Sequence, residues 1–330
     1  MIAARHIPII AEAGVNHNGS IDLALRLVDA AAAAGADIVK FQTFKAETIV
    51  AKSAQMAEYQ KTNTGRSESQ YAMLKRLELT DDDHRRIMER CREQNIGFLS
   101  TAFDVEGVAY LDGLGLRLHK VPSGELTNLP YLRAIAACGK SVLLSTGMAT
   151  EAEVAAAMGV LAGCEVTLMH CTTAYPCPFE AVNLNALQTL HERFGCPVGY
   201  SDHTRGITIP IAAVAMGAQV IEKHFTLDRD SEGPDHRASL EPAEFQAMVR
   251  AIRELEAAFG DGVKVPTAAE MMNVAVARKS LVAKRAIRKG DVFTADNLTV
   301  KRPGTGISPM RWDEFIGKPA EHDYAEDDLI

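Results

Sequence analysis

Short apolar runs alternate with longer amphipathic segments over the first two-thirds of the chain. The short runs have the near-continuous hydrophobicity of strands buried on both faces of a parallel sheet, and the longer segments have helical spacing. Eight strands that alternate with helices are typical of a (β/α)8 TIM barrel, which we place at residues 1–260. The predicted strands cover Pro8–Gly14, Ala36–Thr43, Gly97–Phe103, Leu116–Gly124, Ser141–Gly147, Val166–Thr173, Pro197–Thr204 and Gln219–Leu227.

Helix signals separate these strands. Asp22–Ala34 is rich in alanine and leucine and ends at Gly35, a common helix stop. Helices are also expected after Thr80 and Thr150, because acidic residues follow each of them in the first turn. A doubly wound open sheet is the main alternative, but its usual G-x-G-x-x-G turn after the first strand is absent. The connection over residues 44–79 is long for a compact domain, and we interpret it as a segment that covers a substrate.

The pattern changes after Phe259. Glycine, proline and small polar residues predict a linker at 261–276, and short strands with turns predict a small domain at 277–330. A domain of this size is marginal alone, so we expect it to pack against its own barrel or against that of a partner.

Composition and charge exclude several classes of protein. The net charge of -8 and the absence of a lysine- and arginine-rich run argue against nucleic-acid binding. The sequence contains no apolar stretch long enough to span a membrane and no signal peptide, so we expect a cytoplasmic protein. The six cysteines form no C-x-x-C pair, and we interpret them as free thiols.

Polar residues fall at the C-terminal ends of the predicted strands, where TIM barrels carry their active sites. Two lysines among hydroxyl groups favour a bound phosphate or carboxylate. They are Lys40 and Lys120, and the hydroxyls belong to Thr101, Ser123, Ser145 and Ser201. Each lysine alone would be read as a surface residue, but two at strand ends of one barrel indicate an anion site.

Two histidines end neighbouring predicted strands. His203 and His224 can converge on one divalent metal, with water or substrate oxygens in the open positions. Such a site would suit manganese or magnesium. Glu12, Glu125 and Asp235 are candidates for binding hydroxyls or transferring protons, and each taken singly could equally be structural.

The order and spacing of many motifs resemble the sialic acid synthase family, and the C-terminal segment is similar to that family's antifreeze-like (SAF) domain. The motifs are AEAGVNHNGS, VKFQTFKAE, FLSTAFD, KVPSGELTNLPYL, LLSTGMAT, HCTTAYPCPFEAVNLNAL, YSDHT, IEKHFTLD, GPDHRASLEP and VKRPGTGISP. The resemblance implies a TIM barrel with a SAF domain, in a domain-swapped homodimer whose SAF domain caps the partner's active site.

The resemblance also implies residue roles. Phosphoenolpyruvate would be bound by Lys40, Thr101, Lys120, Ser123, Ser145, Thr173 and Ser201, and the sugar by Glu12, Gln42, Asn63, Tyr175, Asp235 and Arg302. His203 and His224 would hold the metal (manganese, with magnesium or cobalt as alternatives), and Glu125 would lie near the reacting centre. Two departures concern Thr173, where some relatives carry asparagine, and Val276, near where some place phenylalanine.

The implied reaction condenses phosphoenolpyruvate with an N-acetylated aminohexose. Our main expectation is N-acetylmannosamine and water, giving N-acetylneuraminate and phosphate by carbon–oxygen cleavage. The alternative is 2,4-diacetamido-2,4,6-trideoxymannose, giving legionaminate. Three other functions remain open: a Schiff-base aldolase that uses a lysine, a metal-dependent hydrolase and a non-catalytic carbohydrate-binding protein.

Overall fold

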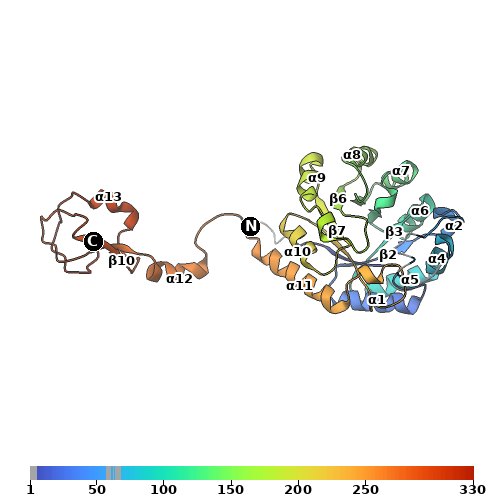
Figure 1. Ribbon diagram of the computed structural model, residues 1–330, viewed down its shortest axis with the longest axis horizontal. Helices are drawn as coiled ribbons and strands as arrows, with labels where there is room; N and C mark the ends of the chain where they lie inside the picture. The colour runs from blue at the N-terminus through green and yellow to red at the C-terminus, as the bar shows by residue number, and fades with distance from the viewer. Residues whose placement is uncertain (1–5, 57–60, 62, 64–67) are drawn as a thin grey trace. The chain divides into compact units, whose positions relative to one another are not determined.

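The computed structural model describes residues 6–56, 61, 63 and 68–330. Its first compact unit ends at Phe259 and contains eight parallel strands in a closed barrel, in the order β1 to β8. This confirms the predicted TIM barrel (Figure 1). The strands are β1 Ile9–Gly14, β2 Ile38–Thr43, β3 Gly97–Ala102, β4 Leu118–Val121, β5 Ser141–Ser145, β6 Val166–His170, β7 Val198–Asp202 and β8 Ile221–His224.

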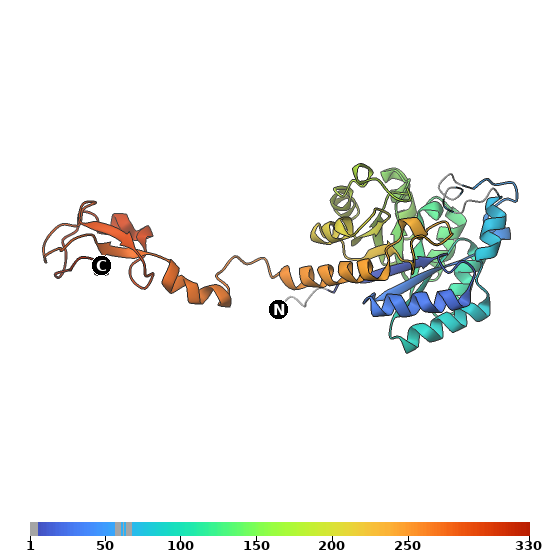
Figure 2. The ribbon, with the colours of Figure 1, turned by 60° about the horizontal axis from the view of Figure 1, so that its bottom comes forward.

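Helices cover the outside of the barrel. They are α1 Ile21–Ala33, α5 Asp81–Glu93, α6 Val105–Gly113, α7 Leu129–Ala137, α8 Glu151–Val160, α9 Ala186–Phe194, α10 Thr208–Ala215 and α11 Pro242–Ala258. Thr80 and Thr150 begin α5 and α8 with capping boxes, as their sequences predict. Helix α11 packs against α10 and α1 and so completes the ring of helices; Figure 2 shows it in orange beside the blue α1.

Short helices lie in the loops at the C-terminal end of the barrel. The long connection after β2 carries α2 (Ala46–Ile49) and α4 (Gln70–Leu77). Three 3-10 turns follow β4, β6 and β8, namely η1 Ser123–Glu125, η2 Phe179–Ala181 and η3 His236–Ala238. These segments surround the ends of the strands from which the predicted site residues project.

The second compact unit, Gly260–Ile330, has a small core of its own. Strands β9 (Ser280–Ala283) and β10 (Leu298–Lys301) pair antiparallel, and η4 (Pro309–Arg311) and α13 (Trp312–Phe315) follow. Part of the segment predicted as a linker is helical, since α12 covers Ala268–Ala277. Thr267 and Glu270 form a capping box there, a T-x-x-E signal that is visible in the sequence.

Two further sequence features can be placed. All six cysteines lie within the described residues and are free thiols. Among the described helices, none is both long enough and apolar enough to cross a membrane.

Candidate active site

A cavity of about 300 Å³ opens at the C-terminal ends of the barrel strands. Thirteen of the sixteen predicted site residues line it: Glu12, Lys40, Gln42, Thr101, Lys120, Ser123, Ser145, Thr173, Tyr175, Ser201, His203, His224 and Asp235. Glu125, Asn63 and Arg302 are not among the lining residues. The ends of the strands and the loops after them therefore bring together both lysines, both histidines and all five predicted serine and threonine hydroxyls.

Strand register sets the level of these side chains. Glu12 on β1 is paired in register with Lys40 on β2 and with His224 on β8. Thr101 on β3 is paired with Lys120 on β4. Because residues in register on parallel strands lie at the same depth, these polar groups form one layer inside the barrel.

Lys40 is buried and makes polar contacts with Glu12, Thr101 and Glu222. Its Nζ lies 2.6 Å from Glu12 Oε2 and donates a hydrogen bond of 3.0 Å to Thr101 Oγ1. The amide of Gln42 donates to the other oxygen of Glu12 at 3.2 Å. Lys40 also lies near Glu222, which joins it to Lys120.

Glu222 is a central residue of the site, and the sequence reasoning did not select it. Its Oε1 lies 3.7 Å from Lys40 Nζ and 3.5 Å from Lys120 Nζ, and accepts a hydrogen bond of 3.2 Å from Ser201 Oγ. Lys120 also donates to Ser145 Oγ at 2.8 Å. The sequence did carry a signal: Glu222 is two residues before His224, so both side chains point to the same side of β8.

Burial and the two lysines shift the pKa values of Glu12 and Glu222 in opposite directions. Burial would raise the pKa of Glu222, but Lys120 and Lys40 outweigh it and lower that pKa to about 2. Burial raises the pKa of Glu12 to about 7, against the opposing effect of Lys40. With Glu12 protonated, the layer contains two cations and one anion, a net positive charge that suits an anionic ligand.

The two histidines are arranged as neutral ligands for a divalent cation. Their ring centroids are 5.4 Å apart, and burial lowers the pKa of each. His203 Nδ1 donates to the carbonyl of Thr172 at 2.7 Å, which leaves the lone pair of Nε2 available. His224 Nδ1 is buried without a hydrogen-bond partner among the described residues, and Asp235 Oδ2 lies 4.0 Å from it. These residues fit a divalent metal ion.

Asp235 belongs to the loop after β8. Its burial raises the pKa of its carboxyl to about 6, opposed by Lys40. Tyr175 lies over the histidines, with its ring centroid 4.2 Å from that of His203. One side of the cavity therefore combines the carboxyl of Asp235, the ring of Tyr175 and the two histidines.

A second group of hydroxyls gathers around Gly147. A Cβ at this position would lie 2.3 Å from Thr173 Oγ1 and 2.7 Å from Ser123 Oγ, so a glycine is required for the close approach. The amide of Gly147 donates to Ser123 Oγ at 3.0 Å. Thr173 Oγ1 is buried and has no hydrogen-bond partner in the described residues. Such a hydroxyl at a cavity wall is available to a ligand.

The remaining predicted residues lie elsewhere. Asn63 donates to the carbonyl of Pro234 at 2.7 Å and so links the long connection to the loop of Asp235. Glu125 lies in η1 and accepts a hydrogen bond of 2.6 Å from Asn128. Arg302 belongs to the second unit, where its Nε donates to the carbonyl of Ala277 at 3.1 Å.

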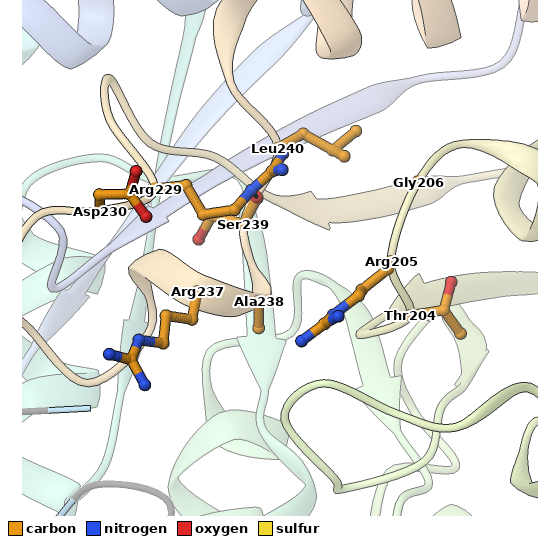
Figure 3. Close-up of a pocket in the computed structure, with 9 residues that line it drawn as sticks. All are labelled: Thr204, Arg205, Gly206, Arg229, Asp230, Arg237, Ala238, Ser239 and Leu240. Atoms are coloured by element: carbon orange, nitrogen blue, oxygen red, sulfur yellow. Dashed lines mark hydrogen bonds between the residues drawn. The ribbon is translucent and has the colours of Figure 1, made fainter. Parts of the chain in front are cut away.

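A neighbouring cavity of about 420 Å³ lies against the loops after β7 and β8 and contains none of these site residues. Arg205, Arg229 and Arg237 line it, but Figure 3 shows their guanidinium groups well apart rather than meeting at one point. Arg229 is paired with Glu244 and donates to the carbonyl of Ser239. We therefore assign the chemistry to the cavity that contains the lysines and histidines.

Comparisons with known proteins identify the family of the chain. The chain matches the NeuB family over residues 27–264 and the SAF domain over residues 278–330. It is 53% identical to the N,N'-diacetyllegionaminic acid synthase of Campylobacter jejuni, over 98% of both chains. It is 46% identical to a protein of the same name from Legionella pneumophila, over 94% of this chain and 89% of that protein.

A solved structure shares the fold. The N-acetylneuraminic acid synthetase of Leptospira borgpetersenii, crystallised with citrate, superposes with a TM-score of 0.73 at 35% identity. The match covers 82% of this chain and 91% of that chain. The resemblance seen in the sequence is thus confirmed: the chain belongs to the NeuB family and is an enzyme of the sialic acid synthase type, with a TIM barrel followed by a SAF domain.

Proposed function

We propose that the protein condenses phosphoenolpyruvate with 2,4-diacetamido-2,4,6-trideoxymannose and water to give N,N'-diacetyllegionaminate and phosphate. The choice of this sugar rests on the two relatives named as N,N'-diacetyllegionaminic acid synthases. The sequence placed N-acetylmannosamine first and this sugar second, and the comparisons support the second. N-acetylmannosamine remains the competing substrate.

One observation carries the assignment of phosphoenolpyruvate. Lys40 and Lys120 lie on either side of Glu222 in one buried layer, with hydroxyls of Thr101, Ser145 and Ser201 around them. Two cations held apart in this way can bind the two anionic groups of one small molecule. The hydroxyls of Ser123 and Thr173 near Gly147 supply further donors for phosphate oxygens.

The residues of the chain support the following reaction. A divalent cation bound by His203 and His224, most simply manganese, with magnesium or cobalt as alternatives, would polarise the aldehyde oxygen of the open-chain sugar. Lys40 and Lys120 hold the phosphate and carboxylate while carbon 3 of phosphoenolpyruvate bonds to the aldehyde carbon. Water adds at carbon 2, and phosphate then leaves as the bond between carbon 2 and the phosphate oxygen breaks.

Two carboxyl groups are suited to proton transfer and sugar binding. The pKa of Glu12, about 7, lets it exchange a proton near neutral pH. Asp235 and Gln42 line the same cavity and can hydrogen-bond sugar hydroxyls. Glu125 is expected near the reacting centre, but it lies in η1 beyond the end of β4, accepts a hydrogen bond from Asn128 and does not line the cavity.

The proposal includes a homodimer in which the SAF domain of one subunit covers the barrel mouth of the other. Met271, Met272 and Val276 are exposed apolar residues of α12, and an interface would bury them. Arg302 would then reach the acetamido group of the sugar in the partner's site. Light scattering of the full chain tests the dimer, and an Arg302→Ala variant with a raised KM for the sugar only would support this contact.

Phosphate release tests the function directly. The purified protein is stripped of metal and mixed with manganese, phosphoenolpyruvate and either sugar, with and without chelator, and the product is weighed by mass spectrometry. Chelator-sensitive release with the diacetamido sugar, at a higher kcat/KM than with N-acetylmannosamine, supports the proposal. A preference for N-acetylmannosamine would change only the identity of the sugar substrate and would leave the proposed reaction as it is. Absence of phosphate release with both sugars, together with an imine trapped by borohydride, would indicate an aldolase.

A further inference from the structure

Three potential metal ligands meet at the end of the barrel opposite the active site. Helices α6 and α7 run back from the mouth, so Asp112 near the end of α6 and Cys138 after α7 lie at the N-terminal end of the strands. His119 is the second residue of β4 and is directed away from the barrel interior, since Lys120 beside it points inward. One ligand atom from each residue lies within 4.8 Å of the other two.

The histidine of this cluster is buried, and one of its ring nitrogens has no hydrogen-bond partner among the described residues. His119 is 2% exposed, and its Nε2 has no hydrogen-bond partner within the part of the chain that the structure describes. Asp112 Oδ1 lies 3.6 Å away, and that carboxylate is paired with Lys140 Nζ at 2.5 Å. A buried imidazole nitrogen without a partner costs free energy unless a ligand fills the role.

The donor set has a chemical preference. A thiol, an imidazole and a carboxylate suit a borderline-soft cation with tetrahedral geometry, whereas magnesium and calcium prefer oxygen ligands. Burial lowers the pKa of His119, so its ring is neutral and able to coordinate. The thiol of Cys138 donates to the carbonyl of Ala134 at 3.3 Å and is protonated, because burial raises its pKa.

We propose that Asp112, His119 and Cys138 form a second metal site, for Zn²⁺ or a cation of similar chemistry, separate from the pair His203 and His224. Coordination would displace the thiol proton of Cys138 to solvent and replace Lys140 at Asp112, with water as the fourth ligand. The side chain of Lys140 is 27% exposed and can turn into solvent. A bound ion would join α6, β4 and α7 and would stabilise the strand that carries Lys120.

Cobalt substitution reads out this site without relying on activity. Metal-free full-length protein is titrated with Co²⁺, and the near-ultraviolet absorption is followed for a sulfur-to-cobalt charge-transfer band. The wild type and a His203→Ala, His224→Ala double variant should both gain the band, with one equivalent bound at this site in each. Cys138→Ser should lose it, and His119→Asn should weaken Co²⁺ binding by about 10-fold or more.

Cys164→Ser is the matched control, because Cys164 is also a partly buried free thiol but does not belong to the cluster. This variant should keep the band. Absence of the band in the wild type, or its survival in Cys138→Ser, would overturn the proposal. Loss of the band in the double histidine variant would also overturn it, since the cobalt would then belong to the active site. Circular dichroism identifies any variant that fails to fold. If Cys138→Ser does not fold, the Co²⁺ affinity of His119→Asn tests the proposal in its place.

Discussion

Two buried ion-pair clusters share β8, one on its outward side with β7 and one on its inward side with β2 and β4, and they differ in how completely their polar atoms are hydrogen-bonded. The outward cluster pairs Lys223 with Asp202 at 2.5 Å, and both side chains are 0% exposed. Lys223 also donates to the carbonyl of Thr204, whose amide and hydroxyl donate to Asp202 at 3.0 Å each. The inward cluster places Glu222 between Lys40 and Lys120 at 3.7 and 3.5 Å, and Glu222 Oε2 has no hydrogen-bond partner among the described residues.

We expect this difference to distinguish a structural cluster from a binding cluster. Buried charges are costly unless they are paired and hydrogen-bonded, and the outward cluster meets both conditions within the protein. In the inward cluster the pairs of Glu222 with the two lysines are longer, and its second oxygen has no hydrogen-bond partner among the described residues at the cavity wall, so this carboxylate and the lysines can interact with a ligand. We therefore expect substitutions in the inward cluster to affect catalysis, and those in the outward cluster to affect stability.

The largest expected effect is on activity, in Lys120→Met. We expect kcat/KM to fall about 1000-fold, because a charge-assisted contact to phosphoenolpyruvate is lost from a buried site. The thermal midpoint should change little, since Lys40 still balances Glu222. Steady-state kinetics and calorimetry measure the two effects. A large drop in midpoint with normal kinetics would show that the inward cluster is structural.

The same substitution in the outward cluster should have the opposite effect. Lys223→Met leaves the Asp202 carboxylate buried without its cation, so we expect the free energy of unfolding to fall by about 3–5 kcal/mol. Below the unfolding transition, its kcat/KM should fall far less than that of Lys120→Met. Urea denaturation measures the loss. Wild-type stability in this variant would remove the distinction between the clusters.

Sequence reasoning found the barrel and the layer of polar strand ends because both follow from local periodicity. It did not select Glu222 over Lys223, although the two-residue spacing from the predicted metal ligand His224 already places Glu222 on the inward side of β8. The contact of Glu222 with Lys40 was beyond prediction, because β1 separates β2 from β8 in the barrel and side-chain reach decides the contact. Glu125 is the opposite case: it was selected from the sequence but does not line the cavity, because it lies in the turn η1, where it accepts a hydrogen bond from Asn128.

The buried carboxyl of Asp235 should make the free energy of unfolding depend on pH, unlike a fully hydrogen-bonded core. Burial raises its pKa from 3.8 to about 6, so the folded state favours the protonated acid. The penalty is therefore absent below pH 4, grows as the pH rises toward 6 and is complete above it. At about 1.4 kcal/mol per pKa unit, it amounts to about 3 kcal/mol.

Asp235→Asn should remove this penalty. We expect its free energy of unfolding to exceed that of the wild type by about 3 kcal/mol at pH 8 and to match it near pH 4. The KM for the sugar should rise, because a charged acceptor is lost from the cavity. Urea denaturation across this pH range provides the measurement, with Asp230→Asn as an exposed control that should show neither change. A constant difference at every pH would mean that the effect does not come from ionisation.

The smallest expected effect concerns the close approach at Gly147. A methyl group there would lie 2.3 Å from Thr173 Oγ1 and 2.7 Å from Ser123 Oγ, so Gly147→Ala must displace both hydroxyls. We expect the KM for phosphoenolpyruvate to rise about 10-fold and the free energy of unfolding to fall by about 1–3 kcal/mol. Gly159→Ala is the matched control, because nothing lies within 4 Å of its added Cβ and its position in α8 favours alanine by about 0.5–1 kcal/mol. If both variants bound phosphoenolpyruvate equally well, the hydroxyls near Gly147 would have no part in the anion site, and Lys40 and Lys120 would have to hold the substrate by themselves.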